Sequence, residues 1–171
     1  GFEWSSSPEG NNLHRVVIYR DGAANTSRTV PYSLFDGDDP EDLWKYMSDY
    51  EQTIGGQVLA IPHNGNLSNG LMFSDKTLSG KRIDKGYAEA RMRWEPLIEV
   101  AQMKGDGETH PLLSTEDEYA DFETWDVSNI DGSTAKEDWM LQYEYARSAL
   151  KLGLELGEKL GVNPYKFGLS A

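Results

Sequence analysis

The chain contains no cysteine, few cations and no long apolar run. Without cysteine it forms no disulfide, offers no thiolate nucleophile and lacks the ligands of a cysteine-type zinc site. Only 16 lysines and arginines stand against 29 aspartates and glutamates, so the net charge of −13 makes nucleic acid and anionic membrane surfaces poor partners. No segment approaches the roughly 18 consecutive apolar residues of a membrane-spanning helix. To bind a phosphorylated small molecule, the chain would need a local cluster of cationic side chains.

The length predicts one domain. A chain of 171 residues can bury one sizeable core and is too short for two of ordinary size. We therefore expect a single domain over residues 1–171 without an internal boundary. The chain starts and ends on strand-like segments, at 1–4 and 167–171, so we expect it to be a fragment of something longer.

Strand-like and helix-like segments alternate along the chain. Short apolar or β-branched runs at 15–20, 57–61 and 97–102 are typical of strands, whereas 40–54, 84–93 and 136–160 carry helical periodicity. This order favours an α/β fold with parallel strands, arranged as part of a barrel or as an open sheet.

Capping signals set the expected helix boundaries. Asp39 precedes Pro40 at the start of the first helix, Gly55 ends it, and Asp84 can cap the second. Thr134 and Glu137 have the spacing of a capping box, which predicts that the longest helix begins there. The face of that helix that we expect to be buried consists of Tyr143, Ala146, Leu150, Leu154 and Gly157.

Two long polar segments interrupt the alternation. Residues 63–83 are rich in asparagine and glycine, which predicts a mobile rim loop that shapes a substrate entrance. Residues 103–134 are also polar and irregular. Four of the tryptophans are expected in the core, namely Trp44, Trp94, Trp125 and Trp139.

The histidines lie beside expected strands. His63 directly follows one strand, His110 lies in the loop after the next, and His14 precedes the strand at 15–20. Ligands collect at the carboxyl ends of strands in α/β folds, which suits His63 and His110 better than His14. Each could equally be an ordinary surface or hydrogen-bonded histidine.

Carboxylates accompany these histidines. Glu3 and Glu99 interrupt strand-like runs, and Asp106 and Glu108 lie just ahead of His110. Imidazoles and carboxylates together suit zinc, manganese or iron. The alternative for Glu99 is a structural ion pair inside the fold, with Arg147 as its partner.

Five ordered motifs resemble the family described as domain of unknown function 3604, which looks distantly similar to the polymerase and histidinol phosphatase (PHP) superfamily. The resemblance covers essentially the whole chain. The motifs are Gly-Phe-Glu-Trp at 1–4, Gly-Asn-Asn-Leu-His-Arg-Val-Val-Ile-Tyr-Arg-Asp-Gly at 10–22, Ala-Ile-Pro-His-Asn-Gly-Asn at 60–66, Pro-Leu-Ile-Glu-Val-Ala-Gln-Met-Lys-Gly-Asp-Gly-Glu-Thr-His at 96–110, and Gly-Val-Asn-Pro-Tyr-Lys-Phe-Gly at 161–168.

The resemblance implies a distorted, TIM-type α/β barrel that hydrolyses phosphoesters with several divalent metal ions. It places Glu3, His14 and His63 as metal ligands, with Glu99 at a position that is less regularly a ligand. The superfamily's opening His-x-His motif would precede residue 1 and its closing Asp-x-His motif would follow Ala171. We therefore expect incomplete metal binding and little activity from the chain by itself.

These inferences together predict a fragment of a metal-dependent hydrolase, a phosphoesterase that uses metal-activated water. The alternative is a binding or structural module on the same scaffold that has lost catalysis. The expected partner is a small molecule that could carry a phosphate, and not nucleic acid or a membrane. Open strand edges in a partial barrel would favour self-association. The candidate substrate contacts are Arg15, Asn64, His110 and Arg147.

Overall fold

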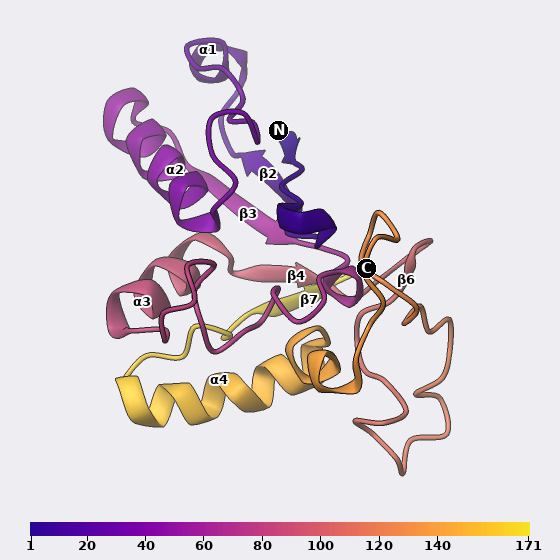
Figure 1. Ribbon diagram of the computed structural model, residues 1–171. Helices are drawn as coiled ribbons and strands as arrows, with labels where there is room; N and C mark the ends of the chain where they lie inside the picture. Colours follow the sequence, from indigo (N-terminus) through magenta and orange to yellow (C-terminus); the bar gives the residue numbers. More distant parts are fainter.

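A computed structural model describes residues 1–171 and combines helices with three small sheets (Figure 1). The first sheet contains β1 (Phe2–Trp4), β2 (Arg15–Tyr19) and β3 (Val58–Pro62) in that spatial order. In the second, β4 (Leu97–Glu99) pairs with β7 (Gly168–Ser170), and β4 also packs against β3. The third is a hairpin of β5 (Ala101–Gln102) and β6 (Gly105–Asp106).

The expected α/β class is confirmed only as a mixture of helices and strands with one parallel pair. The strands β4 and β7 run parallel, but β1, β2 and β3 pair antiparallel, and no barrel is closed. The reason lies in residues 21–39. After β2 this segment brings the chain back to the end of β1 and the start of β2, where Gly37 O accepts a hydrogen bond from Trp4 Nε1 (3.1 Å). The helix that follows then returns the chain to the end of β2, so β3 starts opposite Tyr19 and runs the other way.

Local caps place the middle helices as predicted. Helix α2 (Pro40–Ile54) begins at Asp39, whose carboxylate accepts from the Glu41 main-chain N–H, and ends at Gly55 in the left-handed region (φ 76°). Helix α3 (Lys85–Trp94) is capped by Asp84, which accepts from the main-chain N–H of Tyr87. A single further turn, α1 (Ala23–Thr26), follows β2.

The longest helix starts later than predicted, and its buried face is different. Helix α4 (Ala146–Leu160) is preceded by a separate 3₁₀ helix, η3 (Asp138–Tyr143). Thr134 caps neither helix, because η3 begins after Glu137 and α4 after Tyr145. Leu154, expected inside, is 70% exposed. Ala146 is buried as predicted, and the other buried positions of the helix are Ala149, Gly153 and Leu156.

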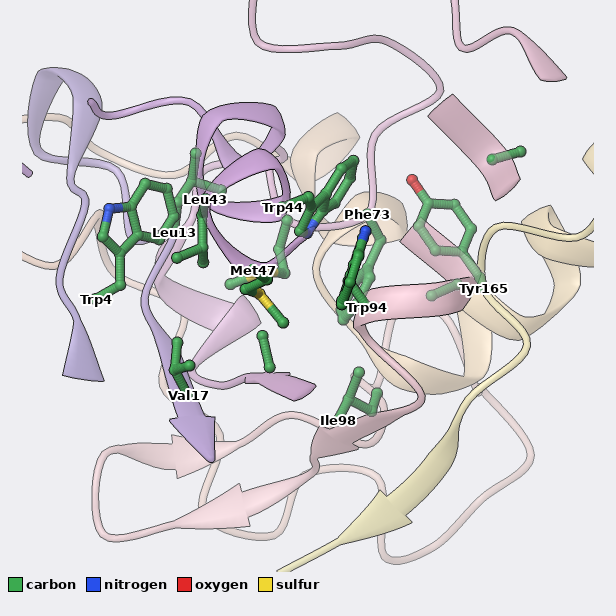
Figure 2. Close-up of a cluster of buried hydrophobic side chains, with 14 of the residues drawn as sticks. Trp4, Leu13, Val17, Leu43, Trp44, Met47, Phe73, Trp94, Ile98 and Tyr165 are labelled. Atoms are coloured by element: carbon green, nitrogen blue, oxygen red, sulfur yellow. The ribbon is translucent and has the colours of Figure 1, made fainter. Parts of the chain in front are cut away.

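The core lies between the sheets and helices α2 and α3 (Figure 2). Figure 2 shows the rings of Trp44, Trp94 and Phe73 close together, with Ile98 of β4 below them. Trp44 and Trp94 are buried as expected, but Trp125 and Trp139 are 49% and 54% exposed, so that part of the prediction is wrong. No helix has the length and apolar character needed to cross a membrane.

The first part of the segment after β3 packs inside the protein, unlike a rim loop, whereas residues 79–82 of the same predicted loop are exposed. Every residue from 62 to 70 is buried, and the 3₁₀ turn η2 (Gly65–Leu67) packs so tightly that a Cβ on Gly65 would collide with the main-chain oxygen of Glu144. Two of its main-chain carbonyls accept hydrogen bonds from one buried asparagine. Asn12 Nδ2 donates to the carbonyls of His63 (2.8 Å) and Asn64 (3.0 Å), so the segment is held at depth by hydrogen bonds.

Candidate metal centre

Three side chains with metal-ligating atoms meet at one edge of the first sheet. Glu3 lies in the middle of β1, His14 directly before β2 and His63 directly after β3. Because these strands are antiparallel neighbours, the start of β2 and the end of β3 lie at the same edge. The His63 N–H donates to His14 O (3.4 Å), which extends the β2–β3 pairing to the two histidines themselves.

The predicted convergence of these residues is confirmed. Glu3 Oε1 lies 2.9 Å from His14 Nδ1 and 3.4 Å from His63 Nε2. One ligand atom from each of the three residues lies within 4.8 Å of the others. Metal bonds to such atoms are about 2.0–2.2 Å long, so a cation between them could contact all three after small side-chain movements.

The second ring nitrogen of His14 is also engaged. His14 Nε2 and Ser7 Oγ are 2.9 Å apart, which fixes the ring so that Nδ1 faces Glu3. A hydrogen bond on the far nitrogen is the usual support of a metal-binding histidine. His63 Nε2 faces Glu3, and the Nδ1 of this ring is buried without a hydrogen-bond partner.

Burial and charge favour the protonation states that bind a cation. Burial lowers the pKa of His14 and His63, which favours neutral imidazoles. Burial acts to raise the pKa of Glu3, but the attraction of His63 and His14 outweighs it, so the pKa lies below its usual value. The Glu3 side chain is 47% exposed, while that of His63 is 5% exposed. The group is therefore anchored in the protein and open to solvent on the Glu3 side.

The whole chain, residues 1–171, matches the family model described as "Protein of unknown function (DUF3604)". The chain belongs to this family. No curated protein and no solved structure matches it.

Glu99 of this DUF3604 chain lies close enough to His63 to act on it, but it is not one of the three residues that converge. Its negative charge acts on His63, and its Oε1 accepts a hydrogen bond from Gln102 Nε2 (2.6 Å). The ion pair between Glu99 and Arg147 that we considered as an alternative does not form. Arg147 instead binds Glu108 (2.6 Å) and Asp117 (2.6 Å).

The cationic substrate contacts that the sequence suggested are occupied by carboxylates. Arg15 is completely buried, and its Nε bonds Glu95 Oε1 at 3.0 Å, because strand alternation turns it to the core side, opposite His14. Arg147 holds the two carboxylates already described. Both guanidinium groups are therefore paired with carboxylates of the chain itself.

His110 and Asn64 differ in what they leave free. Both ring nitrogens of His110 are engaged: Nδ1 accepts from the Leu112 N–H (3.2 Å), and Nε2 lies 3.0 Å from Asp126 Oδ2. Asn64, next to His63, is buried in a left-handed conformation (φ 50°), and both its amide atoms lack a partner. Of the four suggested substrate contacts, Asn64 is the one with polar atoms to spare.

Sequence reasoning missed Ser7 and Lys104. Ser7 stands in a run of three serines, and nothing in that run indicates which hydroxyl reaches a histidine. Lys104 belongs to the Lys-Gly-Asp string that we had noted only for its acids, yet its positive charge acts on both His14 and His63. A lysine placed before a glycine between two short strands was the only available signal.

Proposed function

We propose that this DUF3604 chain contributes metal ligands to a divalent-metal-dependent hydrolase of phosphoesters. The convergence of Glu3, His14 and His63 within 4.8 Å carries the proposal. The motif resemblance to the PHP superfamily supports the reaction class. That support rests on residues and not on architecture, because the sheet that holds the group is antiparallel.

The donor set fits zinc, manganese or iron. Two imidazoles and one carboxylate are common ligands of these ions, and three protein ligands leave positions for water and substrate. A bound divalent ion would make a water molecule more acidic and would neutralise charge that develops on a phosphoryl group.

The residues of the chain have separate tasks in this proposal. His63 and His14 bind from the buried side as neutral imidazoles, and Ser7 keeps the His14 ring in place. Glu3 supplies the negative charge and borders the open side, where a substrate can enter. Glu99 adds a second negative charge close to His63.

A matched pair of histidine variants tests the proposal. The protein tested is the longest one that contains this chain. Metal content and affinity are measured with Zn²⁺, Mn²⁺ and Fe²⁺ on its wild type, His63→Gln and His110→Gln, and hydrolysis of p-nitrophenyl phosphate is followed in parallel. His110 is a suitable control, because it is also a buried histidine with a carboxylate partner. We expect His63→Gln to weaken binding by at least about 10-fold and His110→Gln to leave it unchanged.

Two results decide against the proposal or redirect it. A wild type that binds none of the three metals, or an equal loss in both variants, overturns the metal centre. Metal binding at Glu3, His14 and His63 without hydrolysis in the longest protein that contains this chain favours the non-catalytic module.

A further inference from the structure

One lysine of this acidic chain is held partly inside the protein without a counterion. Five of the 16 lysines and arginines are not exposed to solvent. Four of them bind carboxylates, namely Arg15, Arg91, Lys136 and Arg147. The fifth, Lys104, makes no salt bridge, and every other cation without a carboxylate partner is exposed. Lys104 is a partly buried residue without an anion inside the chain, so its ammonium group is free to bind one from outside.

The position of Lys104 is fixed by its main chain. Met103 and Lys104 form the turn between β5 and β6, and Gln102 pairs with Gly105 across it. Gly105 has φ 106°, and a Cβ there would lie 2.6 Å from the Cβ of Trp125, so only glycine fits. The main-chain conformation of the turn is therefore fixed, and so is the position of the Lys104 Cα.

The same turn is tied to the chain that follows His63. Asn66 Nδ2 donates to Lys104 O (3.1 Å), and Asn66 lies three residues after His63 in the buried segment. Consistent with this placement, the charge of Lys104 acts on both His14 and His63.

We propose that Lys104 binds the anionic group of the substrate, an oxyanion of the phosphoryl type, beside the Glu3–His14–His63 centre. The inference rests on the proposed function and deepens it. A net charge of −13 repels an anionic ligand from most of the surface, so a local cation is needed to hold one. Arg15 and Arg147 are already bound to carboxylates, which leaves Lys104 as the cation free for this task.

The role predicts opposite effects on two ligands. Lys104→Met removes a positive charge near the histidines, so Mn²⁺ should bind roughly 2- to 5-fold more tightly in the absence of anions. Inorganic phosphate should bind the Mn²⁺-loaded variant at least about 10-fold more weakly, because a charge-assisted hydrogen bond is lost. A merely structural lysine would weaken both ligands together. Lys104→Arg should restore phosphate binding.

Calorimetric titrations of Mn²⁺, and then of inorganic phosphate into the Mn²⁺-loaded protein, test this on the wild type and both variants. Lys45→Met, which removes one exposed charge on α2, is the control for net charge. If the wild type binds Mn²⁺ and Lys104→Met keeps the wild-type affinity for phosphate, the role of Lys104 is overturned and the metal centre is not. An equal loss in Lys45→Met, or a loss of Mn²⁺ affinity in Lys104→Met, also overturns it. A wild type that does not bind Mn²⁺ overturns this role together with the proposed manganese centre.

Discussion

Replacing Glu95 by glutamine should be among the most damaging single changes in this chain. Glu95 is 2% exposed and lies between two buried guanidinium groups, 3.0 Å from Arg15 Nε and 3.1 Å from Arg91 Nε. Its Oε1 also accepts from Trp44 Nε1 at 2.9 Å. The substitution keeps the shape of the side chain and removes its charge, so two buried cations lose their counterion at once.

The loss follows from the cost of an uncompensated buried charge. Breaking a buried pair by neutralising one partner typically costs about 3–5 kcal/mol. For a domain of this size each kcal/mol shifts the melting temperature by about 2–4 °C, so Glu95→Gln should lower it by roughly 6–20 °C. Urea unfolding and scanning calorimetry measure the two quantities. The control is Glu89→Gln, which breaks an exposed pair with Lys85 on α3 and should cost less than about 0.5 kcal/mol.

The pH dependence gives a second check on the same group. Burial alone would raise the pKa of Glu95, but Arg15 and Arg91 outweigh it, and the pKa lies below its usual value in the folded chain. The stabilisation is therefore present above about pH 4.5 and disappears as the pH falls through the lowered pKa. Wild type and Glu95→Gln should converge in stability at low pH. A loss below about 1 kcal/mol at pH 7, or a gap that stays constant down to pH 2, would refute the ion-pair argument.

Two more predictions concern carboxylates in different surroundings. Burial raises the pKa of Glu144 to about 6, because its effect exceeds that of the contact with Lys136, which lowers the pKa. The free energy of unfolding should therefore fall by about 2 kcal/mol as the pH rises from 4.5 towards 7. Glu144→Gln should flatten this pH dependence in urea titrations. An unchanged slope would contradict this. Glu99 has only Gln102 as a hydrogen-bond partner, so Glu99→Gln should leave the melting temperature nearly unchanged and weaken divalent-metal binding at His63 several-fold. A large loss of stability with metal affinity intact would end the view that Glu99 serves the site.

Features set by a few neighbouring residues could be predicted from the sequence, and features that need distant partners could not. Asp39 and Asp84 cap their helices through main-chain groups two and three residues away. Thr134 has the same kind of local signal, yet the side chain of Asn129 takes its N–H. The four-residue pattern of a capping box does not show whether a side chain outside it will bond the same N–H.

The prediction of a rim loop after β3 was wrong for its first part for the same reason. Asparagine and glycine normally indicate exposed turns, because their polar groups need water or a partner. Here Asn12, which is 51 positions from His63 in the sequence, supplies hydrogen bonds that allow the segment to be buried. Composition alone contains no information about such a partner.

Strand direction explains why the three ligands that the family resemblance implied did not suit the expected parallel fold. In a parallel sheet the residue before β2 and the residue after β3 lie at opposite edges, so His14 and His63 could not meet. The antiparallel pairing brings Arg15 opposite Pro62, and the two histidines flank that pair at one edge. The return of the chain along residues 21–39 sets this direction. A polar segment without sequence periodicity therefore determines which side chains can share a metal ion.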